Sequence, residues 1–374
     1  MSGTIQVTSP PGTTGAGGPP PPLSRREQLL SVAFGAWMIV GLFLDGWAHN
    51  NEKPETLLTP WHGVFYSGFI VTAGYSLLLL RRRLRPGSSW RERVPPGLGL
   101  VLVGLGLFGV GGAGDQVWHG LFGIEVDVEA LLSPTHLLLF AGGMLILTGA
   151  FRAAWADGTS MAPSLREFLP PLLSISLASA LVAFFFMYLT PFGRGNYGTW
   201  IGDYTAMVTT DSGTAADYAE DIRVVGIASL LIANLIYVAS LLLLLRRWRP
   251  PFGTATILFT SVTALVGSLD LFAFWVPLLA APLAGLATDA LIHYLQPSAA
   301  NPAALRAVAI AAPVFLWLSF FALFHLDAGV GWSPELWGGV TVMAGLSGGG
   351  LSLLVAPPPL PPAAVPVPPS GPPG

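Results

Sequence analysis

The stretch QLLSVAFGAWMIVGLFLDGWAHNNEKPETLLTPWHGVFYSGFIVTAGYSLLLLRRR, residues 28–83, holds two long apolar runs separated by a short polar segment. Each run is close to the roughly 20 residues that an α-helix needs to cross a bilayer. Three arginines follow the second run directly, as is common where a span leaves the membrane. The stretch therefore predicts two antiparallel membrane-spanning helices joined as a hairpin.

Apolar runs of this kind recur along the whole chain. Of its 374 residues, 52% are hydrophobic and only 10% are charged, whereas soluble domains carry about 25% charged residues. We therefore predict an all-α fold, a polytopic integral membrane helical bundle of about ten transmembrane helices, with the lipid bilayer as its main partner. The candidate helices lie near residues 28–49, 60–80, 97–119, 134–153, 169–190, 222–246, 254–275, 279–296, 304–325 and 334–355.

The ends of the chain differ from this domain in composition. Residues 1–24 are rich in Gly, Pro, Ser and Thr, and residues 356–374 are rich in Pro, so both are predicted to be disordered tails of a transmembrane domain that spans residues 25–355. If the N-terminus lies inside, fourteen arginines fall in inner loops against three basic residues in outer loops. This bias predicts a multi-pass protein of the inner or plasma membrane with both termini in the cytoplasm.

One octapeptide occurs twice in nearly the same form. ETLLTPWH, residues 55–62, is repeated as EALLSPTH, residues 129–136, and each copy follows an Asp-x3-His unit, DGWAH at 45–49 and DQVWH at 115–119. The two units, about 70 residues apart, predict a tandem duplicated hairpin formed by residues 28–80 and 97–153.

Helix geometry predicts what each unit brings together. Asp and His at positions i and i+4 share one helical face, and Thr59 or Ser133 followed by Pro is a good start for the returning helix. An antiparallel hairpin then brings His49 level with His62, and the second unit does the same for its two histidines. We expect imidazoles and carboxylates to gather at the outer end of the bundle.

Imidazole and carboxylate ligands together suit zinc, copper, iron or manganese. The alternative interpretation is that polar residues simply crowd the membrane interface. The chain has no cysteine, so thiolate and iron–sulfur sites are excluded. The predicted metal ligands or their orienting neighbours are Asp45, His49, Glu55, His62, Asp115, His119, Glu129 and His136, with Glu125, Asp127 and His325 as further outer-face candidates.

The pattern Asp45-x3-His49-x12-His62 resembles the copper-ligand motif in the C subunit of particulate methane and ammonia monooxygenases. The resemblance implies that these three residues hold copper. The second unit departs from the motif, because 16 residues separate its histidines. Through DGWAHN and SPTHLLL the whole chain also resembles an uncharacterised family of bacterial polytopic membrane proteins.

Three further ionisable residues are predicted at membrane depth, namely Asp270, Asp289 and His293. Such groups are costly in a bilayer and suggest an ion or proton pathway; interhelical hydrogen bonding is the alternative. The segment 191–221 is interpreted either as a lid over the outer face or as an ordinary surface loop.

Three functions fit these observations. The first is a copper-dependent membrane oxygenase or oxidase acting on a lipophilic substrate, with zinc or iron as other possible metals. The second is a metal-ion or proton-coupled transporter, and the third is a haem protein. No nucleotide-binding loop or other feature indicates a nucleic-acid partner, and the oligomeric state stays open.

Overall fold

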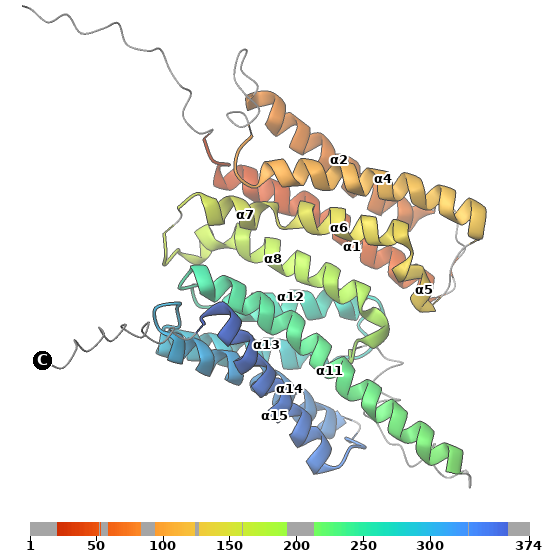
Figure 1. Ribbon diagram of the computed structural model, residues 1–374, viewed down its shortest axis with the longest axis vertical. Coiled ribbons are helices and arrows are strands. Elements are labelled where there is room, and N and C mark those ends of the chain that lie inside the picture. Colours follow the sequence, from red (N-terminus) through yellow and green to blue (C-terminus); the bar gives the residue numbers. More distant parts are fainter. Residues whose placement is uncertain are drawn as a thin grey trace, which may run out of the picture.

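The computed structural model describes residues 21–51, 53, 59–83, 94–123, 127–158, 160–192, 213–327 and 329–357. These residues form helices and turns and contain no β-strand (Figure 1). Nine helices of this described part are long and apolar enough to cross a membrane, which confirms the prediction of an all-α polytopic membrane protein. The helices are α1 (Arg25–Asn50), α2 (Pro60–Arg83), α4 (Leu98–Phe122), α5 (Asp127–Leu132), α6 (Pro134–Leu147), α7 (Gly149–Ala156), α8 (Leu165–Phe185), the 3-10 turn η1 (Met187–Leu189), α11 (Gly213–Arg247), α12 (Thr254–Ser268), α13 (Val276–Leu295), α14 (Pro302–Asp327) and α15 (Pro334–Val355).

Helices α1 and α2 pack as an antiparallel pair whose backbones touch at two glycines. A Cβ atom added to Gly41 would stand 2.5 Å from the Cα of Phe65, and one added to Gly68 would stand 2.6 Å from the Cα of Met38. No side chain fits at either position, so glycine is required for this close approach.

Helices α4 and α6 form a second pair with the same spacing of contacts. A Cβ on Gly111 would lie 3.0 Å from the backbone nitrogen of Leu139, and one on Gly142 would lie 2.7 Å from that of Phe108. The two pairs match position by position. Gly41 and Gly111 each lie four residues before the aspartate of their pair and contact the residue three positions after its second histidine, Phe65 or Leu139. Gly68 and Gly142 each lie six residues after that histidine and contact the residue seven positions before the aspartate, Met38 or Phe108. The two pairs thus share one register.

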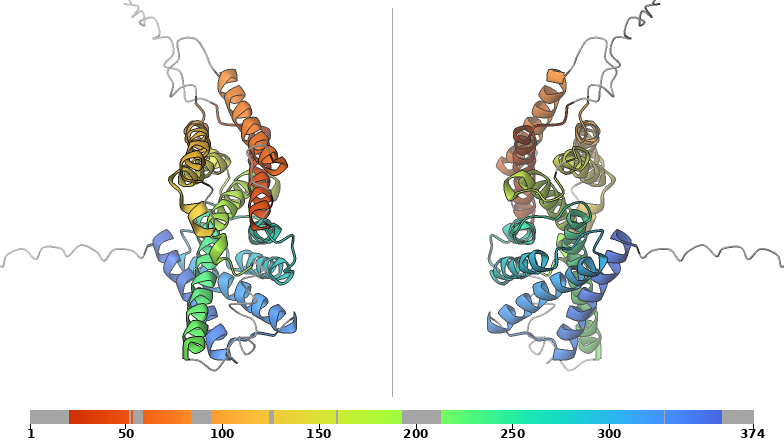
Figure 2. Two further views of the ribbon diagram at one scale, coloured as in Figure 1. Left: turned by 90° about the vertical axis from the view of Figure 1, so that its right-hand side faces the viewer. Right: turned by 90° about the vertical axis from the view of Figure 1, so that its left-hand side faces the viewer.

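The two pairs lie next to each other, as both views in Figure 2 show. Phe108 of α4 packs against Phe65 and Phe69 of α2, with ring centroids 5.7 and 4.8 Å apart. The buried helix α8 supports both pairs from the other side and connects them to α11 and α12 (Figure 1).

One predicted helix ends well before its predicted limit. The one expected at 254–275 ends as α12 at Ser268, because Leu271 and Phe272 adopt left-handed φ angles of 51° and 60° and the Phe272 N–H donates to the Gly267 carbonyl at 2.8 Å. This is the hydrogen bond of a helix-terminating Schellman turn. Asp270 therefore lies in a turn rather than in a helix.

The helix expected at 134–153 is divided at Thr148 into α6 and α7. The Arg152 guanidinium donates to the carbonyl of Leu145 at 2.6 Å and so satisfies an acceptor that the break leaves free.

The segment 191–221 was expected to be a loop, but α11 already begins at Gly213, and residues 193–212 lie outside the described residues. A short helix, α5, occupies part of the connection between α4 and α6. Most of both predicted tails, residues 1–20 and 358–374, also lies outside the described residues, so the tails and the domain limits stay predictions.

Candidate metal sites

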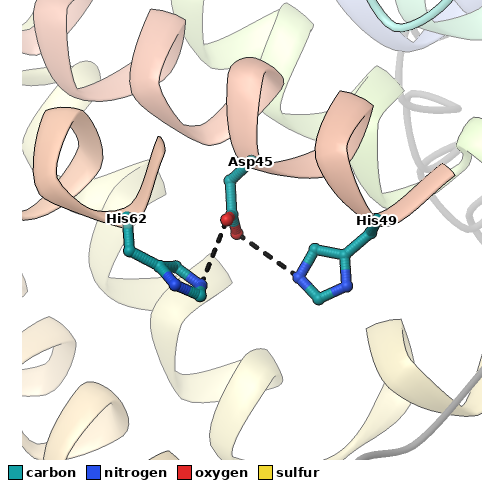
Figure 3. Close-up of side chains that lie close together, drawn as sticks. All are labelled: Asp45, His49 and His62. Atoms are coloured by element: carbon teal, nitrogen blue, oxygen red, sulfur yellow. Dashed lines mark ion pairs between the residues drawn. The ribbon is translucent and has the colours of Figure 1, made fainter. Parts of the chain in front are cut away.

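The last turns of α1 and the first turn of α2 bring Asp45, His49 and His62 together (Figure 3). The Asp45 carboxylate lies between the two imidazoles. Its Oδ1 is 3.1 Å from Nε2 of His62, and its Oδ2 is 3.7 Å from Nε2 of His49. The two rings are 6.3 Å apart, at an angle of 72°. The hairpin thus brings its histidines to one level, as the sequence predicts.

The second hairpin repeats this arrangement with Asp115, His119 and His136. Oδ2 of Asp115 is 3.2 Å from Nε2 of His119, and Oδ1 is 3.5 Å from Nε2 of His136. The ring centroids are 6.1 Å apart. In each group, one nitrogen or oxygen atom from every residue lies within 4.8 Å of the other two.

The predicted N-cap residues also orient the histidines. Ser133 accepts the backbone N–H of His136 at 3.2 Å, and its hydroxyl is 2.8 Å from Nδ1 of the same ring. Thr59 stands in the same relation to His62, with 2.8 Å between hydroxyl and Nδ1. Each cap residue therefore fixes a ring so that Nε2 points to the aspartate. Such an outer partner on the far nitrogen is typical of metal-bound histidines.

The carboxylate–imidazole distances of 3.1, 3.7, 3.2 and 3.5 Å are those of Asp–His ion pairs and would also allow a shared ion. Two of them exceed the upper limit of about 3.2 Å for a good N–H···O bond. Metal–nitrogen bonds near 2.0–2.1 Å in a tetrahedral site place neighbouring ligand atoms roughly 3.3 Å apart, and the four distances lie around this value.

Among the described residues each group offers three potential ligands, and their side chains are partly exposed. The His49 side chain is 40% exposed, whereas Asp45 and His62 are 13% and 17% exposed. In the second group the exposed fractions range from 19% to 27%. Structural zinc sites are closed by four protein ligands, and catalytic sites keep a position for water or substrate. The three potential ligands that each group has among the described residues match the number in the catalytic type.

Two of the remaining outer-face candidates, Glu55 and Glu125, fall outside the described residues. Asp127 begins the short helix α5. Glu129 of the same helix is exposed and, among the described residues, belongs to no group of three potential ligands. His325 is exposed in the last turn of α14, which lies toward the opposite end of the molecule's long axis from the hairpins (Figure 1).

The three membrane-depth candidates do not form one cluster. Asp289 is 1% exposed and accepts hydrogen bonds from the N–H groups of Ala255 and Thr256 at 2.8 and 3.0 Å, so it caps the start of α12. His293 is exposed on α13, and within the described residues neither a hydrogen bond nor an ion pair joins it to Asp289. Asp270 lies half-buried in the turn after α12. A pathway through these residues stays a prediction.

The sequence pattern did not identify two residues that lie next to the groups, Tyr66 and Thr135. Tyr66 stacks on His62, with ring centroids 5.5 Å apart and planes 5° apart, and its hydroxyl is within electrostatic range of both Asp45 and Asp115. Its position four residues after His62 is the signal that could have identified it. Thr135 donates to Oδ1 of Asp115 at 2.8 Å. Its only sequence signal is that it replaces a tryptophan of the first octapeptide.

Comparison with known proteins assigns neither a family nor a function to this arrangement of residues. The likeness to the monooxygenase C subunit therefore rests on the Asp-x3-His-x12-His pattern alone. No protein-family model matches the chain, and neither a curated protein nor a solved structure does so.

Proposed function

We propose that this membrane protein binds two transition-metal ions, one in each Asp–His–His group, with copper as the first choice and zinc or iron next. The observation that carries the proposal is the pair of carboxylates, each facing two imidazole Nε2 atoms at 3.1–3.7 Å. The shared glycine register of the two hairpins supports the predicted tandem duplication, which would account for two such groups in one chain.

The partial exposure of the potential ligands, 13% to 40% for each side chain, supports a reactive role for the ions in a metal-dependent oxidoreductase, a monooxygenase or oxidase. A bound copper or iron ion would supply one-electron and oxygen chemistry, which these side chains cannot supply alone. The chain's own residues orient the imidazoles. Val117, Leu121 and Phe122 of α4, close to Asp115 and His119 in sequence, are 61–72% exposed, as on other candidate membrane spans. The lipophilic substrate is proposed from this membrane setting.

The two alternative functions have less support. A transporter would need ionisable stations along its path, but Asp289 is occupied in capping α12. A haem would need the space between two facing histidines, and in each group a carboxylate pairs with both rings. Figure 3 shows this for the first group.

Metal analysis of the full-length protein in detergent tests the proposal. After equilibration with Cu(II) and gel filtration, we expect two ions per chain in the unchanged protein, one in His62→Ala, one in His136→Ala and none in the double variant. His293→Ala, which changes an exposed histidine outside both groups, is the matched control and should keep two. A double variant that elutes as the folded protein and still binds two ions would refute both sites.

A second measurement tests the oxidoreductase role. Oxygen consumption by the copper-loaded protein is followed with a lipophilic quinol as the reductant. We expect consumption that the His62→Ala and His136→Ala variants lose and the His293→Ala control keeps. Equal rates in all variants would refute catalysis at these groups without refuting metal binding.

A further inference from the structure

The second group contains a chain of hydrogen bonds whose direction can be derived. An ionised carboxylate only accepts, so the Thr135 hydroxyl must donate to Asp115 in the 2.8 Å bond between them. With its single proton used, Thr135 accepts in its 3.0 Å bond with Ser133. The Ser133 proton is thereby used as well. In the 2.8 Å bond with His136, Ser133 must therefore accept, and Nδ1 of the imidazole carries the proton.

His119 reaches the same state by a different route. Its Nδ1 is 3.2 Å from the carbonyl oxygen of Gly123, and a carbonyl can only accept a hydrogen bond. In the neutral form that binds a metal, both rings of the second group therefore direct the Nε2 lone pair to the side of the Asp115 carboxylate. Three electron-pair donors facing one point repel one another unless a cation lies between them, so this group is preorganised for a metal ion.

The first group has no counterpart of Thr135. The residue in that place is Trp61, which has no hydroxyl and cannot link the N-cap residue to the aspartate as Thr135 does. The Thr59 hydroxyl contacts the ring and backbone nitrogens of His62. His49 is also the most exposed of the six ligand side chains, at 40%.

Building on the proposed function, we propose that Thr135 is a positioning residue that makes the two sites unequal. It fixes the tautomer of His136, so that the second site holds its ion tightly, while the first site, without such a residue, exchanges its ion more readily. The second site then retains a resident ion, and the first is where an ion is loaded or lost. Loss of an outer-shell hydrogen bond to a ligand typically lowers metal affinity 10- to 100-fold.

The test measures each site alone in the full-length protein. In the His62→Ala background only the second site remains, and in the His136→Ala background only the first. Cu(II) affinity is measured by competition with a chromophoric chelator, and the Cu(II) electron paramagnetic resonance spectrum reports the ligands. We expect tighter binding at the second site. There Thr135→Val should weaken binding about 10- to 100-fold and alter the spectrum, and Thr135→Ser, which keeps the hydroxyl, should restore both.

The outcomes separate this inference from the proposed function. If neither background binds copper, the proposed sites themselves are wrong. If both bind, but Thr135→Val leaves the affinity and spectrum of the second site unchanged, or Thr135→Ser fails to restore them, the role of Thr135 is refuted and the sites stand. Equal affinities at the two sites would refute their inequality. Thr135→Val in the His136→Ala background is the control for folding and should leave the first site unchanged.

Discussion

Tyr66 is the aromatic residue most closely associated with a predicted ligand. Its ring lies parallel to that of His62, with centroids 5.5 Å apart, whereas Phe140, at the same offset after His136, packs against Phe185 instead, 4.7 Å away. An aromatic pair contributes about 1 kcal/mol beyond its buried area. Because this pair holds the imidazole, Tyr66 should contribute to metal affinity at the first site alone.

We predict that Tyr66→Ala weakens Cu(II) binding at the first site roughly fivefold, which corresponds to about 1 kcal/mol. Tyr66→Phe keeps the stacked ring and should keep the affinity. Competition titration of the single-site His136→Ala protein measures both changes. An equal loss in both variants would show that the hydroxyl, and not the ring, matters.

Residue spacing alone predicted that the Asp–His–His residues of each hairpin come together, because i,i+4 periodicity and the N-caps fix where Asp45, His49 and His62 stand. It could not predict the role of Thr135, because the direction of a hydroxyl bond depends on partners brought near by tertiary packing. It also left open whether the hairpins share one site. The structure shows a separate group of potential ligands in each.

At the scale of the elements, close helix packing positions these ligands. The backbone contacts at Gly41 and Gly68 determine how far apart α1 and α2 lie, and the carboxylate–imidazole distances depend on that separation. Hydropathy predicted the helices themselves. It missed the break at Thr148 and the early end of α12 at Ser268, because both segments remain apolar while local hydrogen bonds turn the backbone.

Gly68→Ala should therefore disrupt the first site from a distance. Its new methyl group would meet the Met38 backbone at 2.6 Å, so α1 and α2 must move apart. We expect copper binding to fall to about one ion per chain. Gly74→Ala on the same helix, where a Cβ meets no atom within 4 Å, is the matched control and should keep two ions. One ion lost from both variants, or from neither, would contradict this account.

Substitution of Asp289 should lower the stability of the protein and leave its metal binding unchanged. Its carboxylate accepts from the backbones of Ala255 and Thr256 and from the Thr256 hydroxyl at 2.7–3.0 Å. Each buried donor that loses its partner costs about 1–3 kcal/mol. Asp289→Ala should lower the unfolding free energy in mixed micelles by about 3 kcal/mol, and Asp289→Asn by less, with two copper ions bound in both. Loss of copper from folded Asp289→Asn would instead indicate a part in an ion pathway.

At the scale of the whole molecule, the first Asp–His–His group and the arginines of α1 and α2 occupy opposite ends of these helices. Asp45 and His49 end α1 and His62 begins α2, whereas Arg25 and Arg26 begin α1 and Arg81–Arg83 end α2. The second group likewise lies at the end of α4 and the start of α6, on the same side of the bundle as the end of α1 (Figure 1). Both proposed sites should therefore face the same side of a membrane.

The positive-inside rule predicts which side this is, since arginine-rich ends stay in the cytoplasm. A membrane-impermeant chelator added to right-side-out vesicles should remove copper from the protein. Added to inverted vesicles, it should remove copper only after detergent opens them. Because the first site is proposed to exchange faster, one ion per chain should leave before the other. Removal from inverted vesicles alone would reverse the predicted orientation, and simultaneous loss of both ions would argue against unequal sites.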